Sequence, residues 1–490
     1  MSVSFFVGSS ASVALAQTTP LPAQTPVPAQ AAPAPAQTPA VVPKASAGPV
    51  DRVRFTGNAR IYDFTRTNRV GTNASAFNTE AKLHGEYTFP GTPWTIGVTY
   101  FGAEPFGANG TNPGFNKKVD NTLPGYALSL LGEYYLQYKT KYATAWTGKQ
   151  IINTPWANPS DSRLVPVIFQ GTAVSVNLSP NTTLGAMYMA RFRHRTSSAF
   201  ESNTLLTSCD NTGAGVPGDP CNPQFTTQGF LLLYGTQKFS PQLSLNAYNY
   251  QVYDIVNMWH LETKYNWAPK SLFNPYVAMQ YVAESNTGTS DIGIVKNHTS
   301  GFQFGASAGK NIDLALSFNA SPYEAFTTAS ASLCGGGSGK FAPKLGGVFG
   351  GGVGLKVPGA PKGTVNCYGG GLASPYTDSY ATDPLYTTTI SQGLADTHKP
   401  GYANKIAGTF QTNDRRFRLI LAHGWYNYSL PSAAQDRRRE FNADLTYFFN
   451  HVDPKQPYRG LAVRYRYADR VQLSAPFDFK YNRAQLEYTF

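Results

Sequence analysis

Three features of this 490-residue sequence predict an antiparallel β-barrel that crosses a membrane with its strands. Apolar and polar residues alternate over many segments, and aromatic residues gather where these segments end. The connections between them are alternately tight turns and long polar loops. The composition agrees, because aromatics reach 13%. Charged residues make up only 14%, against about 25% in soluble proteins. This combination argues against an ordinary cytosolic enzyme.

The first fifty residues are not expected to belong to the barrel. Residues 1–16 contain an apolar stretch and end in Ala14-Leu15-Ala16, as expected of a secretory signal peptide. Residues 17–50 hold nine prolines and a single charged residue, Lys44, which predicts an extended linker. Further along the chain there is no run of about 18 apolar residues, which excludes a conventional transmembrane helix there. We therefore assign residues 51–490 to the barrel.

The four cysteines agree with export to an oxidising compartment. Cys209 and Cys221 bracket one polar loop segment, and Cys334 and Cys367 bracket a glycine-rich one, so two local disulfides are the expected pairing. Four cysteines allow three pairings, and free thiols are a further alternative. No CxxC motif occurs and the seven histidines are scattered, so we expect neither a metal site nor a cofactor.

The alternation is clearest in the last segment of the chain. Ala484, Leu486, Tyr488 and Phe490 fall on one face, and Arg483, Gln485, Glu487 and Thr489 fall on the other. The same pattern recurs in residues 81–89, 94–100, 261–267, 438–449 and 460–467. A strand that places apolar residues on one face and polar residues on the other fits a barrel with lipid outside and water inside.

A soluble β-sandwich also alternates, so other features must decide between the two folds. Aromatic residues mark strand ends, as at Tyr447 to Phe449, which is typical of aromatic girdles at membrane interfaces. Tight turns at 89–93 and 239–241 alternate with long loops at 102–125, 197–224 and 333–385. Phe490 takes the outward position of the final strand. With about 9 to 11 residues per membrane strand, the chain can supply 16 to 18 strands, enough for an aqueous channel.

Many basic residues take the polar, inward positions of these strands. Arg191, Arg193 and Arg195 alternate with apolar or aromatic neighbours, and Arg416 and Arg418 flank Phe417. The same inward side is predicted for Arg54, Arg60, Arg438, Arg464, Arg466 and Arg483. One interpretation is a charged wall that acids such as Glu440 and Glu487 neutralise. The other is a basic track along which a carboxylate exchanges bidentate partners. We assign the net charge of +12 to this wall rather than to nucleic-acid binding.

Several segments resemble the OprD family of outer-membrane porins. The most specific is Gly148-Lys149-Gln150 followed by residues 158–171, and Asp383 to Thr387 and residues 437–490 are similar too. The resemblance spans about residues 51–490. It implies 18 strands, an inward-folded constriction loop that carries Arg163, and an arginine ladder for small carboxylate solutes such as amino acids or aromatic acids.

The sequence therefore predicts passive, substrate-selective diffusion through an outer-membrane channel, without catalysis. The expected partners are outer-membrane lipid, lipopolysaccharide and small carboxylates, with no nucleic acid, and the chain is expected to be a monomer or a homotrimer. One alternative is a general diffusion porin with weak anion preference. Another is a surface adhesin or a barrel hydrolase that uses Ser307 in Gly305-Ala306-Ser307-Ala308-Gly309. That motif needs a strand, a turn and a helix, whereas the alternation around Ser307 predicts a strand or turn.

Overall fold

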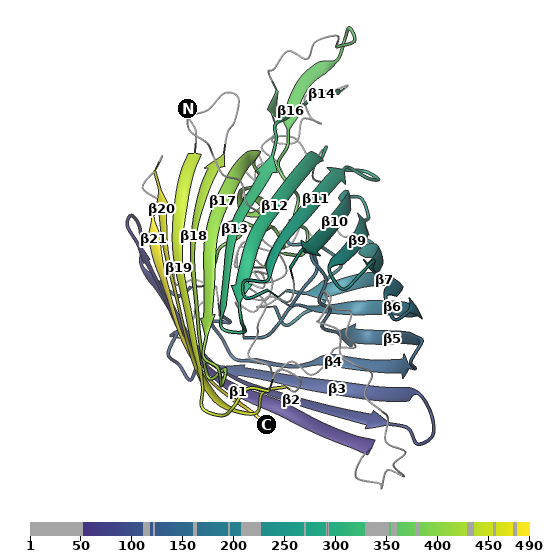
Figure 1. Cartoon of the computed structure of the whole chain (residues 1–490), viewed down its shortest axis with the longest axis vertical. Coiled ribbons are helices and arrows are strands. Elements are labelled where there is room, and N and C mark those ends of the chain that lie inside the picture. Colours follow the sequence, from purple (N-terminus) through teal and green to yellow (C-terminus); the bar gives the residue numbers. More distant parts are fainter. Residues whose placement is uncertain are drawn as a thin grey trace.

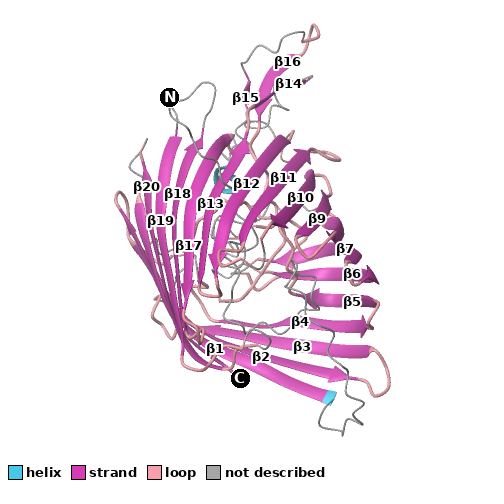
Figure 2. Cartoon of the chain, viewed as in Figure 1, coloured by secondary structure: helices cyan, strands magenta, loops and turns pink. Residues whose placement is uncertain are grey.

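The computed structural model is a closed antiparallel β-barrel of 18 strands, as predicted (Figures 1 and 2). Each barrel strand pairs with the next one along the chain, and β1 (Val53–Asn68) also pairs with β21 (Phe479–Thr489), which closes the cylinder. The structure describes residues 52–110, 118–120, 123–159, 164–194, 197–206, 227–268, 271–290, 292, 294–328, 352–353, 360–377, 382–428, 436–453, 457–473 and 478–490.

The remaining barrel strands follow in chain order. They are β2 (Ala74–Thr88), β3 (Trp94–Glu104), β4 (Leu128–Lys139), β5 (Ala143–Gln150), β6 (Ile168–Ser179), β7 (Thr182–Arg193), β8 (Phe230–Lys238), β9 (Leu243–Val252), β10 (Val256–Asn266), β11 (Pro275–Ser285), β12 (Lys296–Ala308), β13 (Ile312–Ser321), β17 (Gly401–Gln411), β18 (Phe417–Tyr428), β19 (Asp436–Phe448) and β20 (Gly460–Gln472).

The segment between β13 and β17 carries additional elements. A small sheet of β14 (Glu324–Thr328), β15 (Gly352–Val353) and β16 (Val365–Gly369) stands beyond the end of the barrel in Figure 1. It is followed by the short helix α3 (Leu394–Thr397). Cys367 of β16 is disulfide-bonded, and Cys209, Cys221 and Cys334 lie outside the described residues. No helix in the described part of the chain has the length and apolar composition to cross a bilayer.

The predicted alternation appears as an inverted burial pattern. Along β21, Arg483, Gln485 and Glu487 are buried, whereas Leu486 and Tyr488 are 38% and 51% exposed. Apolar side chains point outward and polar ones inward, the reverse of a soluble protein, because the outer surface of a membrane barrel contacts lipid. The signal peptide and linker predicted for residues 1–50 lie outside the described residues.

The two ends of the barrel differ in the length of their connections. At one end, short turns join β2 to β3, β6 to β7 and β12 to β13, and we call this the turn end. At the other, the loop end, long connections follow β3, β5, β7 and β13. In bacterial outer-membrane barrels the short turns face the periplasm and the long loops face outside. Tyr87, Phe89, Tyr447 and Phe449 gather at the turn end, as predicted for an aromatic girdle.

Loop segments fold into the interior of the barrel, as Figure 2 shows. Residues 164–165 and 167, which precede β6, are buried. Residues 382–393, which we call the strap, are almost all buried too, and they form hydrogen bonds with inward side chains of β11, β13, β17, β18 and β19. The core is therefore not a layer between sheets but the packing of these segments against the inner wall.

Gly148 of β5 is a position where the fold requires glycine. Its φ is +128°, and an added Cβ would lie 2.2 Å from the Tyr134 carbonyl oxygen on the neighbouring strand. We expect Gly148→Ala to lower the free energy of unfolding by about 3 kcal/mol, because backbone strain and a backbone clash add. Urea unfolding in lipid vesicles, followed by tryptophan fluorescence, measures this change.

The matched control is Gly91→Ala in the turn between β2 and β3. Gly91 also has a positive φ, +66°, but an added Cβ would meet nothing within 4 Å. Only the conformational cost of about 1 to 2 kcal/mol remains there. Equal losses in the two variants would contradict the close approach at Gly148.

Candidate functional site: the inner wall of the barrel

The strongest basic cluster of the inner wall surrounds Asp444 of β19. Arg464 of β20 forms a two-pronged contact with its carboxylate, with Nε 2.8 Å from Oδ1 and Nη2 2.6 Å from Oδ2. Arg466 donates from Nε to Oδ2 at 2.8 Å, and Arg418 of β18 acts electrostatically on the same carboxylate. One carboxylate thus faces three guanidinium groups, which leaves local positive charge.

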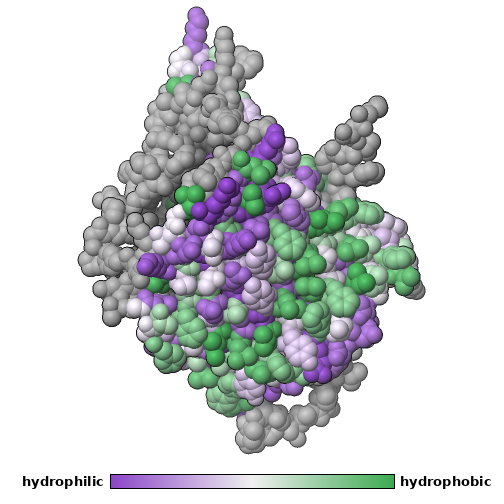
Figure 3. All heavy atoms as spheres, turned by 90° about the vertical axis from the view of Figure 1, so that its left-hand side faces the viewer, coloured by the Kyte–Doolittle hydropathy of each residue, from purple (hydrophilic) through white to green (hydrophobic). Residues whose placement is uncertain are grey.

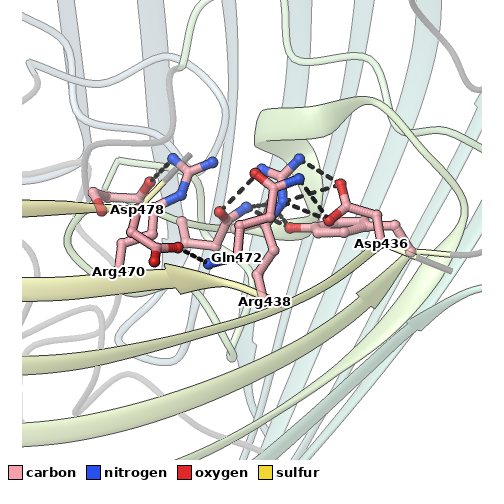
Figure 4. A network of polar contacts seen from close by, with 9 residues as sticks. Asp436, Arg438, Arg470, Gln472 and Asp478 are labelled. Carbon is pink, nitrogen blue, oxygen red and sulfur yellow. Dashed lines mark hydrogen bonds and ion pairs between the residues drawn. The ribbon is translucent and has the colours of Figure 1, made fainter. Parts of the chain in front are cut away.

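A second cluster lies closer to the loop end, where β19 meets β20 (Figure 4). Arg438 contacts Asp436 through Nη2 and Oδ2 at 2.6 Å and donates from Nη1 to the side-chain oxygen of Gln392 in the strap at 3.2 Å. Gln472 donates to Asp436 at 2.9 Å, and Arg470 reaches the Ser391 carbonyl at 3.3 Å. These arginines therefore connect the wall to the strap.

The basic track continues across the closure of the barrel. Arg60 of β1 lies 2.9 Å from Glu487 of β21, measured from Nε to Oε2, and 3.6 Å from Glu80 of β2. Arg483 of β21 is 1% exposed, and its guanidinium lies 5.1 Å from the ring centroid of Tyr62. Five adjacent strands, β18 to β21 and β1, thus carry inward arginines, most of them beside a carboxylate.

The inner wall across β6 to β9 has a different character. Tyr376, from the segment before the strap, packs its ring against Phe169, Phe192 and Phe230, with centroid distances of 5.7, 5.2 and 4.8 Å. Burial raises the pKa of the Tyr376 phenol, which therefore stays neutral. The interior therefore has a basic side and an aromatic side, and on the aromatic side the rings are buried against one another.

The strap is attached to the basic side by charge-assisted hydrogen bonds. Glu440 accepts from the backbone N of Ser391 at 2.9 Å and from its hydroxyl at 2.5 Å, while Asn442 accepts from the Ile390 N at 3.0 Å. Lys405 of β17 donates to the Thr388 carbonyl at 2.6 Å. The motif from Asp383 to Thr387 begins the strap, and Asp383 accepts from the hydroxyl of Thr388.

The sequence prediction for β7 is wrong for Arg191. The pairing of β6 with β7 skips Ala190, because Gln170 pairs with Arg191 and Gly171 pairs with Met189. This bulge reverses the alternation, so Phe192 points inward and Arg191 is exposed on the outer face. Arg193 is buried and donates to the carbonyls of Ser197 and Pro166, so it ties the loop segment to the end of β7.

The other arginines predicted to line the interior have different positions in the structure. Arg416 lies in the turn before β18, not in the wall, because its Nη2 donates to the Tyr447 hydroxyl at 2.9 Å on the outer face. Arg418, Arg438, Arg464 and Arg466 face inward, as predicted. Arg163 and Arg195 lie outside the described residues. Arg470 is an inward arginine that the predicted ladder lacks, although it continues the alternation of Arg464 and Arg466.

The setting of Ser307 differs from that of a nucleophile elbow. Ser307 lies in β12, which a short turn joins to the antiparallel strand β13, and its hydroxyl donates to Asp313 at 2.6 Å. The elbow requires a helix directly after the turn. The expectation that Ser307 lies on a strand or turn is confirmed.

Residues 127–321 match the model of the outer membrane porin, OprD family. This match runs from β4 to β13. Together with the closed 18-stranded barrel, this match identifies the chain as an integral protein of the outer membrane, and both the matched family and the fold are those of channels rather than of an enzyme class. Curated protein sequences provide no match.

Several solved structures share the fold of this chain. A BenF-like porin from Pseudomonas fluorescens Pf-5 aligns with a TM-score of 0.66 and 12% identity, covering 90% of this chain and 99% of its own. OccAB3 of Acinetobacter baumannii gives 0.64 and 16%, covering 89% and 99%. OpdK of Pseudomonas aeruginosa, in a structure with vanillate, gives 0.64 and 11%, covering 90% and 99%.

Proposed function

We propose that this chain is an OprD-family porin and that it lets small carboxylate-bearing solutes diffuse passively across the outer membrane along the inward arginines of β18 to β21 and β1. The observation that carries the proposal is the Asp444 cluster, where one carboxylate shares Arg464, Arg466 and the nearby Arg418. A solute carboxylate can take the place of a protein carboxylate in such a cluster, because guanidinium groups form forks with either.

The arrangement supports movement rather than tight binding. Arg60, Arg438 and Arg464 each already contact a carboxylate, so a passing carboxylate exchanges one partner for another instead of filling an empty charged site. Conduction requires that binding be favourable enough to enter and weak enough to leave. Vanillate, which is present in the solved structure of OpdK, is an aromatic carboxylate of the proposed solute class.

The test is the uptake of benzoate into liposomes, together with the reversal potential of single channels in a salt gradient. We expect Arg464→Ala/Arg466→Ala to reduce benzoate uptake about tenfold and to shift permeability from anions toward cations, because Asp444 then lacks its counter-charges. A variant that also carries Asp444→Asn keeps the wall free of an unpaired buried acid, and it should lose benzoate uptake too.

The matched control is Arg439→Ala, which removes an outward arginine of β19. It should leave benzoate uptake and the reversal potential unchanged. If the two wall variants fold, form channels and still take up benzoate at the wild-type rate with unchanged ion selectivity, the arginine track is wrong.

A general diffusion porin is the second candidate, and the neutralising acids favour it. Asp436, Asp444 and Glu487 each contact an arginine of the track, which weakens the field available to a solute. Benzyl alcohol is similar in size to benzoate but uncharged. Equal uptake of the two by the wild-type channel would support general diffusion with weak anion preference.

A further inference from the structure

Three consecutive arginines of β19 point to opposite sides of the barrel wall. Arg438 faces inward and pairs with Asp436, whereas Arg437 and Arg439 are exposed on the outer face. Lys480 of β21 is exposed on the same outer face, one strand beyond β20. We call Arg437, Arg439 and Lys480 the outer cations. The channel function uses Arg438 and leaves the outer cations without a role.

The outer cations lie at a definite height on the membrane-facing surface. Arg439 is ten residues from the exposed Phe449 at the turn end, and Lys480 is ten residues from the exposed Phe490. Ten residues span about 33 Å of strand, which a tilt of about 40° reduces to about 25 Å, the height of the apolar band of such barrels. The outer cations therefore lie where the apolar band ends toward the loop end.

The surroundings of the outer cations combine charge with apolar surface. Figure 3 shows hydrophilic residues gathered on the upper part of this face and hydrophobic residues below them. Arg439 pairs in register with Trp425, which is 47% exposed, and the exposed Phe441 follows toward the turn end. Asp469 is the register partner of Lys480, so this one acid accompanies Arg439 and Lys480 and net positive charge remains.

We propose that the outer cations bind the phosphate groups of lipid A, the membrane anchor of lipopolysaccharide. The loop end faces outside, and lipopolysaccharide forms the outer leaflet of this membrane. Arginine suits phosphate because its planar fork donates two parallel hydrogen bonds. Phe441 and the apolar band below it lie where the acyl chains of the same molecule would run, and Trp425 has the position of an interfacial tryptophan.

The test compares two substitutions on neighbouring residues of one strand. The purified full-length protein in detergent is titrated with bisphosphorylated lipid A, with monophosphorylated lipid A and with phosphatidylglycerol, and complexes are counted by native mass spectrometry. We expect Arg437→Gln/Arg439→Gln to weaken binding of bisphosphorylated lipid A about tenfold, since charge-assisted bonds to phosphate are lost. The matched control, Arg438→Gln, should bind as the wild type does.

Single-channel recording shows independently that each variant is folded. The double variant should conduct with the wild-type reversal potential, whereas Arg438→Gln should alter it, because only Arg438 faces the lumen. The proposal is wrong if the double variant conducts normally and binds lipid A as tightly as the wild type, or if Arg438→Gln weakens lipid A binding equally. It is also wrong if the wild type binds phosphatidylglycerol as tightly as bisphosphorylated lipid A.

Discussion

Replacing Glu440 with alanine is expected to raise the conductance of single channels severalfold and to make the open current noisy. Glu440 holds the strap in the barrel through the backbone and the hydroxyl of Ser391, both contacts within 2.9 Å. A hydrogen bond to a charged group contributes about 1.5 to 3 kcal/mol, so removing both loosens the strap around Ser391. A strap that leaves the wall widens the water-filled path.

The strap has other attachments, and these define how far the effect extends. Asn442 still accepts from Ile390, and Lys405 still donates to Thr388, so Glu440→Ala should produce fluctuation between two current levels rather than a permanently wide channel. Adding Asn442→Ala should increase the time spent at the higher level. Planar bilayer recordings at fixed salt concentration measure both the levels and their lifetimes.

Glu487→Gln provides the matched control for Glu440. Glu487 is a buried acid of the same wall, but it contacts Arg60, Asn58 and Gln485 on the strands and no residue of the strap. Its replacement changes the charge of the lumen without loosening the strap, so the current should stay quiet. Similar noise in both variants would show that lost charge, not a released strap, causes the effect.

The fold could be predicted from the sequence because the membrane imposes a strict alternation. Lipid disfavours charge on the outward positions within the apolar band, so in segments such as 483–490 the polarity of each residue indicates whether it faces lipid or the interior. The inner assignments of Arg438, Arg464 and Arg466 follow from the same regularity. The prediction holds wherever the pairing of strands is uninterrupted.

The wrong predictions for Arg191 and Arg416 have local physical causes that the alternation of apolar and polar residues does not reveal. One unpaired residue, Ala190, reverses the side of Arg191, and a strand that begins at Phe417 leaves Arg416 in a turn. The strap is a loop in sequence, so its place in the lumen depends on contacts such as that of Glu440 with Ser391, between residues far apart in the chain. Only the family resemblance of Asp383 to Thr387 marked this segment beforehand.

The net positive charge also has a different distribution from the predicted one. The inner arginines are accompanied by acids, including Asp436, Asp444 and Glu487, so the wall holds much less than the whole excess. Exposed cations outside the lumen, among them Arg437, Arg439 and Lys480, account for another part of it. Composition alone could not separate the inward cations from the outward ones, because both occupy positions on the same strands.

Asp444 allows the effect of wall charge to be separated from the effect of wall structure. Asp444→Asn should make the channel more anion-selective, because Arg464, Arg466 and Arg418 then face the lumen with no carboxylate among them. The same substitution should lower the free energy of unfolding by about 3 to 5 kcal/mol, since it breaks a buried ion pair and leaves charge uncompensated. Reversal potentials in a salt gradient and urea unfolding in vesicles measure the two effects.

The reversal potential and the free energy of unfolding together show whether the charge of Asp444 affects permeation or only stability, because the two hypotheses predict different combinations of changes. If Asp444 serves only to hold β19 against β20, Asp444→Asn lowers stability and leaves the reversal potential unchanged. If the cluster governs permeation, the reversal potential shifts toward the anion limit, and Arg464→Ala/Arg466→Ala shifts it the opposite way. The salt dependence gives a further check, because the shift should shrink as ionic strength rises and screening shortens the reach of the three guanidinium groups.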